Sequence, residues 1–156
     1  MFDKMRRADR MMSESEVNEI LSSSEYGSLA VLSANGYPYA VPVNFVVLDG
    51  SVYIHSAKDG AKIRAVEGNS KASFTIVHKH EVMPSKFSSS YESVIAFGTV
   101  DIVEDQQKKI EVLTAFIQKY SSEYFEKGVN YVNADHSKTA LLELKIEHVT
   151  GKSNKS

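Results

Sequence analysis

The segment 37–64 contains the residues whose types and spacing have the clearest chemical meaning. Two extended stretches are joined by Asp49-Gly50, a pair typical of hairpin turns, and they lead into a short polar helix start that contains Gly60 and Lys62. Backbone N–H groups at the start of a helix, together with a lysine ammonium, can bind a phosphate group. The sequence therefore predicts a phosphate-binding corner in this part of the chain.

The composition is that of a soluble globular protein. The chain has 156 residues, of which 42% are hydrophobic and 24% charged, and its net charge of -2 gives no basic surface for nucleic acid. No apolar run approaches the ~20 residues of a membrane span, and the N-terminus lacks the apolar centre of a signal peptide. The absence of cysteine excludes disulfides and thiolate ligands. We expect one cytoplasmic domain over residues 1–156, with neither nucleic-acid nor membrane partners.

Hydrophobic periodicity and turn residues predict the order of the elements. A capping box at Ser13–Glu16 begins a helix to about residue 24. The predicted strands are 27–34, 37–47, 51–56, 71–78, 91–104 and 142–146, and the predicted helices are 59–68 and 106–120. Residues 81–90 are expected to form an irregular connector, Gly98 a bend or bulge, and 121–135 has no clear pattern. This order predicts a mainly β (α+β) fold, in which about six antiparallel strands with short flanking helices close into a barrel.

Strand 37–47 alternates along its length. One face contains Tyr37, Tyr39, Val41, Val43, Phe45 and Val47, and the other contains Pro38, Ala40, Pro42 and Asn44. Proline cannot donate a hydrogen bond to a neighbouring strand. We therefore expect one side of this strand to be irregular or uncovered.

Six fragments in order resemble the pyridoxamine-phosphate-oxidase-like split-barrel flavoproteins, and among them the small nitroimidazole-resistance (Nim) branch. The fragments are M-R-R-A-D-R, Y-G-S-L-A, P-Y-A-V-P-V-N-F, Y-I-H-S-A-K-D-G-A-K, Y-E-S-V-I-A-F-G and E-H-V-T-G-K. The resemblance covers nearly the whole chain. It implies a six-stranded antiparallel Greek-key split β-barrel. It also implies a homodimer that binds FMN in clefts between its two subunits.

The resemblance also implies roles for individual residues. Lys62 matches the lysine that contacts the FMN phosphate, Ser56 and Ala57 match positions near the phosphate and ribityl chain, and Gly60 allows close backbone approach. Val43, Asn44 and Phe45 match the strand along the isoalloxazine, and Ser93, Val94 and Ile95 match the strand that reaches the flavin from the partner subunit. From the residues alone, Lys62 could equally be a solvated helix lysine, Gly60 a turn glycine and Asn44 a backbone cap.

Two groups of histidines have different interpretations. His55 precedes Ser56, and the resemblance places it beside the flavin, where it could donate a proton to a substrate or only bind the flavin. His78 and His80 share a strand face, but without a third ligand a charged strand end is the favoured interpretation and no metal site is predicted.

These features lead to three functional hypotheses. The first is an FMN-dependent reductase of small aromatic acceptors such as nitroimidazoles, with NADH or NADPH as a possible electron donor. The second is a non-catalytic flavin-binding or flavin-sensing module, and the third is a cofactor-free dimeric barrel for protein interaction. Oxidation of pyridoxamine phosphate is disfavoured, because no arginine follows Arg64 to supply that family's arginine-histidine substrate motif.

Overall fold

Seven antiparallel strands form one curled sheet in the computed structural model, which describes residues 1–155. Along the sheet the order is β2-β1-β5-β6-β7-β4-β3. The strands are β1 (Tyr26–Leu32), β2 (Pro38–Asn44), β3 (Val46–Leu48), β4 (Ser51–Ala57), β5 (Lys71–Met83), β6 (Ser88–Ile102) and β7 (Thr139–Asn154). The mainly β split-barrel prediction is confirmed, with seven strands in place of six.

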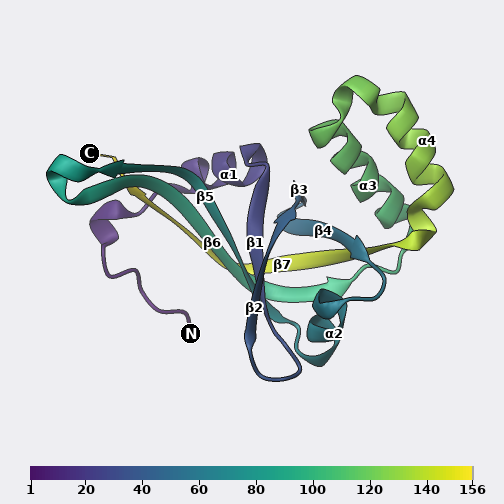
Figure 1. The fold of residues 1–156 in the computed structure, drawn as a ribbon, viewed down its shortest axis with the longest axis horizontal. Coiled ribbons are helices and arrows are strands. Elements are labelled where there is room, and N and C mark those ends of the chain that lie inside the picture. The colour runs from purple at the N-terminus through teal and green to yellow at the C-terminus, as the bar shows by residue number, and fades with distance from the viewer. Residues whose placement is uncertain (156) are drawn as a thin grey trace.

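The extra strand arises at Phe45. The predicted strand 37–47 is wrong as one element, because Phe45 separates β2 from β3. These two strands lie at opposite ends of the sheet order, so one residue links the two edges of the sheet. The sheet must therefore curl until its edges approach each other, as Figure 1 shows. The Phe45 side chain is fully buried at this closure.

β2 lies at one edge of the sheet and pairs only with β1. Its side chains alternate as predicted: Tyr39, Val41 and Val43 pack against the core, whereas Pro38 and Pro42 are exposed. An edge strand tolerates proline because its outer side has no ladder to complete. The prediction of an uncovered side is confirmed.

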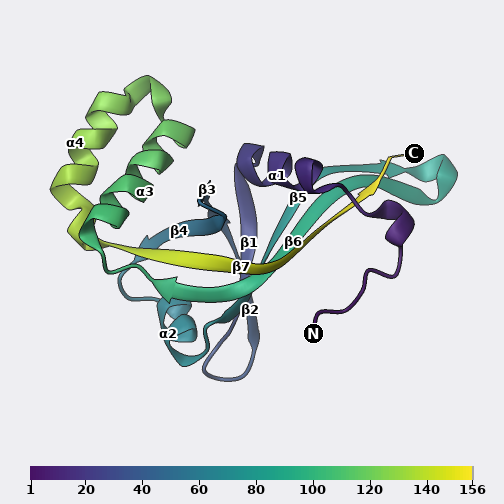
Figure 2. The same cartoon turned by 180° about the vertical axis from the view of Figure 1, so that it is seen from behind.

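Four helices flank the sheet. They are α1 (Glu14–Ser23), α2 (Ala61–Gly68), α3 (Gln106–Tyr120) and α4 (Phe125–Asp135), with 3-10 turns at Ala8–Arg10, Pro84–Lys86, Ser122–Tyr124 and His136–Lys138. The predicted capping box is confirmed, since the Ser13 side chain accepts from the Glu16 N–H and the Glu16 carboxylate accepts from the Ser13 N–H. α3 and α4 form a pair beside the sheet, and the chain then returns along β7 (Figures 1 and 2).

Three strands are longer than the sequence pattern indicated. The irregular connector predicted over 81–90 is wrong, because β5 continues to Met83 and β6 begins at Ser88. The end of this hairpin projects beyond the core and is largely exposed, so it has no hydrophobic alternation to detect. β7 likewise extends well past the predicted 142–146. The bulge predicted at Gly98 is confirmed by a register shift between Phe97 and Gly98.

Two groups of buried side chains make up the core. The larger group fills the curled sheet beneath α1 and α2 and includes Leu29, Phe74 and Leu144. The smaller one packs α3 against the outside of β3, β4 and β7 and consists of Val46, Tyr53, Val112, Phe116 and Leu141. Within residues 1–155, no helix is both long and apolar enough to cross a membrane.

Candidate functional site

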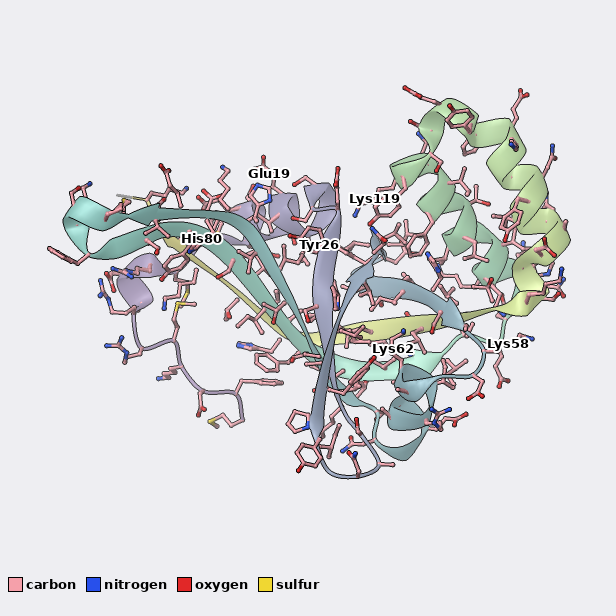
Figure 3. All side chains as sticks on the ribbon, viewed as in Figure 1. Glu19, Tyr26, Lys58, Lys62, His80 and Lys119 are labelled. Atoms are coloured by element: carbon pink, nitrogen blue, oxygen red, sulfur yellow. The ribbon has the colours of Figure 1, made fainter. Side chains whose placement is uncertain are left out.

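The predicted phosphate corner lies where β4 leads into α2. β4 ends at Ala57, and Gly60 is the N-cap of α2, so the first backbone N–H groups of the helix have no partner within it. Arg64 is paired with Asp59 at 2.5 Å, whereas Lys62 forms no ion pair with any residue in 1–155. Figure 3 shows Lys58 and Lys62 on this side of the molecule. The corner therefore combines free N–H donors with an uncommitted ammonium, a suitable set for a phosphate dianion.

Gly60 is not required by the fold. Its φ of 166° is extended backbone that any residue can adopt, and a Cβ at this position would meet nothing within 4 Å. The space in front of the helix start is therefore open. This observation agrees with a role in the close approach of a ligand, because neither backbone strain nor packing accounts for a glycine here.

His55 lies on β4, two residues before its end. Its imidazole forms an edge-on contact with the Phe116 ring of α3, with centroids 4.8 Å apart and an interplanar angle of 76°. Partial burial lowers the pKa of His55, and the nearby positive charge of Lys62 lowers it further. The ring is therefore biased toward its neutral form, in which one nitrogen donates and the other accepts a hydrogen bond. The same effect shows that Lys62 lies close enough to His55 to influence its charge.

Aromatic contacts on α3 connect His55 with the break between β2 and β3. The ring of Phe116 stacks on that of Tyr120 at 5.9 Å. The Tyr120 hydroxyl accepts a hydrogen bond from the Phe45 N–H at 3.0 Å and lies 2.6 Å from the Glu25 carbonyl oxygen. The end of β2 and the end of β4 therefore meet at one face of α3.

The three residues predicted to lie along the isoalloxazine differ in how far their side chains are exposed. Asn44 is exposed, and its amide donates to the Glu25 carbonyl oxygen at 3.1 Å, so it caps a neighbouring backbone group. Val43 packs against the core, and the Phe45 ring is buried against Phe74. For Phe45, only the backbone could contact a ligand.

The third predicted group lies elsewhere on the chain. Ser93 and Ile95 point outward from β6 into a cavity of about 410 Å³ that also contains Phe97, His148 and the N-terminal residues. The Phe2 ring stacks on His148 over this face, with centroids 4.6 Å apart. Val94 points the other way and is buried in the core, so its side chain cannot contact a ligand on the outer face. No contact links this group to the His55 and Lys62 corner within residues 1–155.

His78 lies at a register shift in β5 and forms a hydrogen bond with the Ser24 hydroxyl at 3.2 Å. Within the described residues 1–155, no three histidine, aspartate or glutamate side chains gather in a geometry that could bind a metal ion.

The sequence did not identify Phe116, Tyr120 and Thr139 as part of the site. Phe116 and Tyr120 belong to the apolar stripe of α3, which by spacing alone is typical of a core-facing helix. Thr139 is the residue opposite Ala57 in the β4–β7 ladder. Only the pairing of distant strands and helices places Phe116 and Thr139 beside His55, and Tyr120 next to Phe116.

The curled antiparallel sheet, whose two edges are linked through Phe45, is that of a split-barrel protein. The sequence matches the family described as pyridoxamine 5'-phosphate oxidase over residues 13–153, and the chain belongs to this family. A search of curated proteins gave no match.

Solved structures with the same fold come from several bacteria. A candidate 5-nitroimidazole antibiotic resistance protein from Bacteroides thetaiotaomicron is 22% identical with a TM-score of 0.74, covering 91% of this chain and 85% of its own. The flavocytochrome Anf3 from Azotobacter vinelandii is 19% identical with a TM-score of 0.84, and the match covers 98% of this chain and 73% of the Anf3 chain. An FAD-binding protein from Mesorhizobium loti is 21% identical with a TM-score of 0.65, and the match covers 94% of this chain and 98% of the Mesorhizobium loti chain. At these identities the likeness concerns the fold.

Proposed function

We propose that this protein is an FMN-binding flavoprotein that reduces small aromatic acceptors of the nitroimidazole type. The observation that carries the proposal is the position of His55 between the Lys62 corner and the aromatic face of α3. A phosphate binding site and a neutral imidazole near an aromatic surface are the groups that a flavin reductase needs in one place. Membership of the pyridoxamine 5'-phosphate oxidase family supports the same conclusion.

A bound flavin would supply the two-electron chemistry, with electrons from NADH or NADPH or another donor. The α2 N–H groups and Lys62 would hold its phosphate, and Ser56 and Ala57 at the end of β4 would lie next to the ribityl chain. His55 would donate a hydrogen bond or a proton to the acceptor. Its lowered pKa favours the neutral ring near pH 7, whose single N–H can donate a hydrogen bond, whereas proton donation requires the imidazolium form that becomes populated as the pH falls.

Two solved structures bear on the details. The name of the Bacteroides thetaiotaomicron protein supports a nitroimidazole-type acceptor, whereas the Mesorhizobium loti protein is described as FAD-binding. We favour FMN, because the corner around Lys62 accounts for one phosphate and has no evident extension for an adenylate. Competition between FMN and FAD for the purified protein distinguishes these two cofactors.

We also propose that the protein acts as a homodimer with the flavin between its subunits. Two observations support this assembly: Ser93 and Ile95 are separated from the Lys62 corner on one chain, and Val77, Ile95 and Phe97 expose apolar surface on β5 and β6. Exposed apolar surface of this kind is typical of an interface. The dimer would bring Ser93 of one subunit toward the flavin of the other.

A flavin titration followed by steady-state assay tests the proposal. We expect the fluorescence of micromolar FMN to be quenched on binding. We also expect the complex to oxidise NADH or NADPH when a nitroimidazole is added. The variant His55→Ala should retain FMN but lose roughly 10²–10⁴-fold in turnover per bound flavin. Loss of FMN with normal turnover per remaining flavin would assign His55 to binding alone. FMN binding without turnover by the parent protein would favour the non-catalytic flavin module.

A further inference from the structure

Two basic side chains and a tyrosine meet where the N-terminal segment lies against β6 and β7. Arg10 ends the 3-10 turn Ala8–Arg10, Tyr91 lies on β6, and Lys152 lies on β7. The Arg10 guanidinium donates to the Tyr91 hydroxyl at 3.3 Å, and the Lys152 ammonium lies 5.8 Å from the centre of the Tyr91 ring. Two positive charges therefore share one aromatic side chain.

Backbone pairing holds Arg10 in this position. The Met12 N–H donates to the Gly151 carbonyl oxygen at 3.0 Å, and Met11 forms an isolated antiparallel bridge with Lys152. The turn at the N-terminus therefore lies beside the last part of β7, as both ribbon views show (Figures 1 and 2). The main chain, and not only the flexible side chains, brings the two cations together.

Neither of these cations forms an ion pair with a carboxylate in the described chain, residues 1–155. The two oxygens of the nearby Asp9 carboxylate accept from Arg7, at 2.8 and 2.5 Å. Glu92 follows Tyr91 in β6 and so points to the other face of the sheet, where it pairs with Lys79 at 3.2 Å. Two half-buried cations without a counter-charge repel each other, and a bound anion would offset that repulsion.

Hydroxyl groups lie next to the two cations on the same face of the sheet. Lys152 is the ladder partner of Ser93, and alternate residues of a strand share a face, so Tyr91, Ser93 and Lys152 project to one side. The Tyr91 hydroxyl accepts the hydrogen bond from Arg10, which leaves its own proton free to donate. Ser93 and Lys152 line the same cavity, whose lining includes one carboxylate, that of the exposed Asp3.

The two cations also act on the Tyr91 phenol. The hydrogen bond from Arg10 is the main cause that lowers the pKa of Tyr91, and Lys152 lowers this pKa as well, against the opposing effect of burial. A phenol whose anionic form is favoured in this way lies in a region of positive potential.

We propose that Arg10, Tyr91 and Lys152 form a second anion site, which binds a phosphate group of a ligand other than the flavin. The guanidinium offers paired N–H donors to the phosphate oxygens, the ammonium adds a second positive charge, and the tyrosine hydroxyl adds a neutral donor. Inorganic phosphate and a phosphate carried by a nucleotide share this chemistry.

The nucleotide source that we expect is NADPH, through its 2′-phosphate. In the proposed dimer, Ser93 lies toward the flavin of the other subunit, and Lys152 is its ladder partner. An electron donor bound at Lys152 would therefore lie near a flavin. This assignment of the source rests on the proposed reductase function, whereas phosphate binding at the three residues does not.

NMR titration with inorganic phosphate tests the site in flavin-free protein and in protein saturated with FMN. We expect saturable shifts of the Tyr91 ring signals in both, and no comparable shift from sodium chloride at the same ionic strength. An equal shift from sodium chloride would reduce the effect to general screening and overturn the proposal. Loss of the shift in the FMN complex would also overturn it, because the flavin phosphate would then occupy the cluster.

Adenosine 2′-monophosphate and adenosine distinguish the two sources of the phosphate. Tighter binding of the monophosphate than of inorganic phosphate would assign the site to a nucleotide, whereas equal affinities would assign it to inorganic phosphate. Adenosine should cause no saturable shift at Tyr91. A shift from adenosine as strong as that from its monophosphate would contradict recognition of the phosphate.

Substitution of each cation should weaken the site. We expect Arg10→Gln and Lys152→Gln each to raise the Kd for phosphate roughly ten- to a hundredfold, because each removes one charge-assisted contact. Lys145→Gln is the matched control on β7, since Lys145 is paired with Asp101 at 2.9 Å, and it should bind phosphate like the parent. If Arg10→Gln does not fold, Lys152→Gln decides the question, because unchanged affinity in that variant contradicts the proposal.

Failure of this inference is distinguishable from failure of the proposed function. Phosphate shifts at Tyr91 in a protein that does not bind FMN would support the anion site and remove the flavin function. FMN binding and turnover without phosphate shifts would remove the anion site alone.

Discussion

The hydroxyl of Tyr120 lies 3.0 Å from the backbone nitrogen and 2.8 Å from the carbonyl oxygen of Phe45. Phe45 is the residue that leaves both strand ladders where β2 ends and β3 begins. Its N–H would be buried without a partner if this hydroxyl were absent. α3 therefore stabilises the closure of the sheet through two side chains at its C-terminal end, because Lys119 also donates a hydrogen bond to the Phe45 carbonyl oxygen at 2.9 Å.

Removing that hydroxyl should destabilise the fold. We expect Tyr120→Phe to lower the free energy of unfolding by about 1–3 kcal/mol, because the Phe45 N–H loses its acceptor while the ring remains. Urea unfolding monitored by circular dichroism measures the change. Tyr124→Phe is the matched control, since Tyr124 is 66% exposed, and its stability should stay close to that of the parent. Equal stability of both variants would contradict a role for Tyr120 at the closure.

The charge of Lys62 should be measurable at His55. We expect the His55 imidazole to titrate below the ordinary value of ~6.5 in an NMR pH series, and Lys62→Gln to raise its midpoint. Lys58→Gln is the control, because burial and Lys62 are the causes of the lowered pKa of His55. An unchanged midpoint in Lys62→Gln would mean that burial alone lowers the pKa.

The same pKa shift predicts a pH dependence of stability. Because folding lowers the pKa of His55, the unfolded chain binds its proton more readily than the folded protein. The contribution of His55 to the free energy of unfolding is therefore complete above ~6.5 and is lost as the pH falls toward the folded pKa. His55→Gln should flatten urea unfolding midpoints across that acidic window. A parallel loss of stability in parent and variant would assign the effect to other groups.

Lys62 should contribute to FMN affinity. We expect Lys62→Ala to raise the Kd for FMN roughly ten- to a hundredfold, because one charge-assisted contact to the phosphate is lost from the corner. Lys127→Ala, at an exposed position of α4, is the control and should bind FMN like the parent. Fluorescence quenching of FMN gives both constants, and circular dichroism verifies folding. Equal affinities would return Lys62 to the status of a solvated helix lysine.

A shared site between subunits can be tested by mixing variants. Lys62→Ala and Ser93→Arg should each weaken FMN binding as homodimers, because each defect affects every site. In a mixed dimer, one site combines both defects and the other has neither. When equal amounts of the unfolded chains are mixed and refolded, about half of the dimers are mixed, so about a quarter of all sites should bind FMN like the parent. Absence of restoration, or sedimentation of an FMN-bound monomer, would contradict the dimer.

Gly98 should be essential for the fold at the bulge in β6. A Cβ there would lie 1.9 Å from the Lys145 carbonyl oxygen, which the backbone of β7 cannot vacate cheaply. We expect Gly98→Ala to cost roughly 3–5 kcal/mol in urea unfolding, or to prevent folding. Gly68→Ala meets nothing within 4 Å and should be neutral or slightly stabilising. Comparable stabilities would show that the bulge relaxes around the added methyl group.

Local features of the chain were determined by the sequence itself. The capping box at Ser13, the alternation along β2 and the bulge at Gly98 all depend on neighbours within a few residues. The junction of β4 and α2 belongs to the same class, because Ser56, Gly60 and Lys62 are close in the sequence, and phosphate binding there stays a prediction. Period and turn chemistry are sufficient for such features.

The tertiary structure decided where those features meet. At the break between β2 and β3, the Phe45 N–H donates to Tyr120, which lies 75 residues away, and no local pattern encodes that pairing. The α3 stripe predicted only a buried face, yet Phe116 lies against His55 and lines a cavity with residues of α4 and β7. The exposed end of the β5–β6 hairpin has no core to impose alternation, so backbone pairing alone defines it. Contacts between distant segments, each stabilised only once the sheet has curled, are what the sequence could not show.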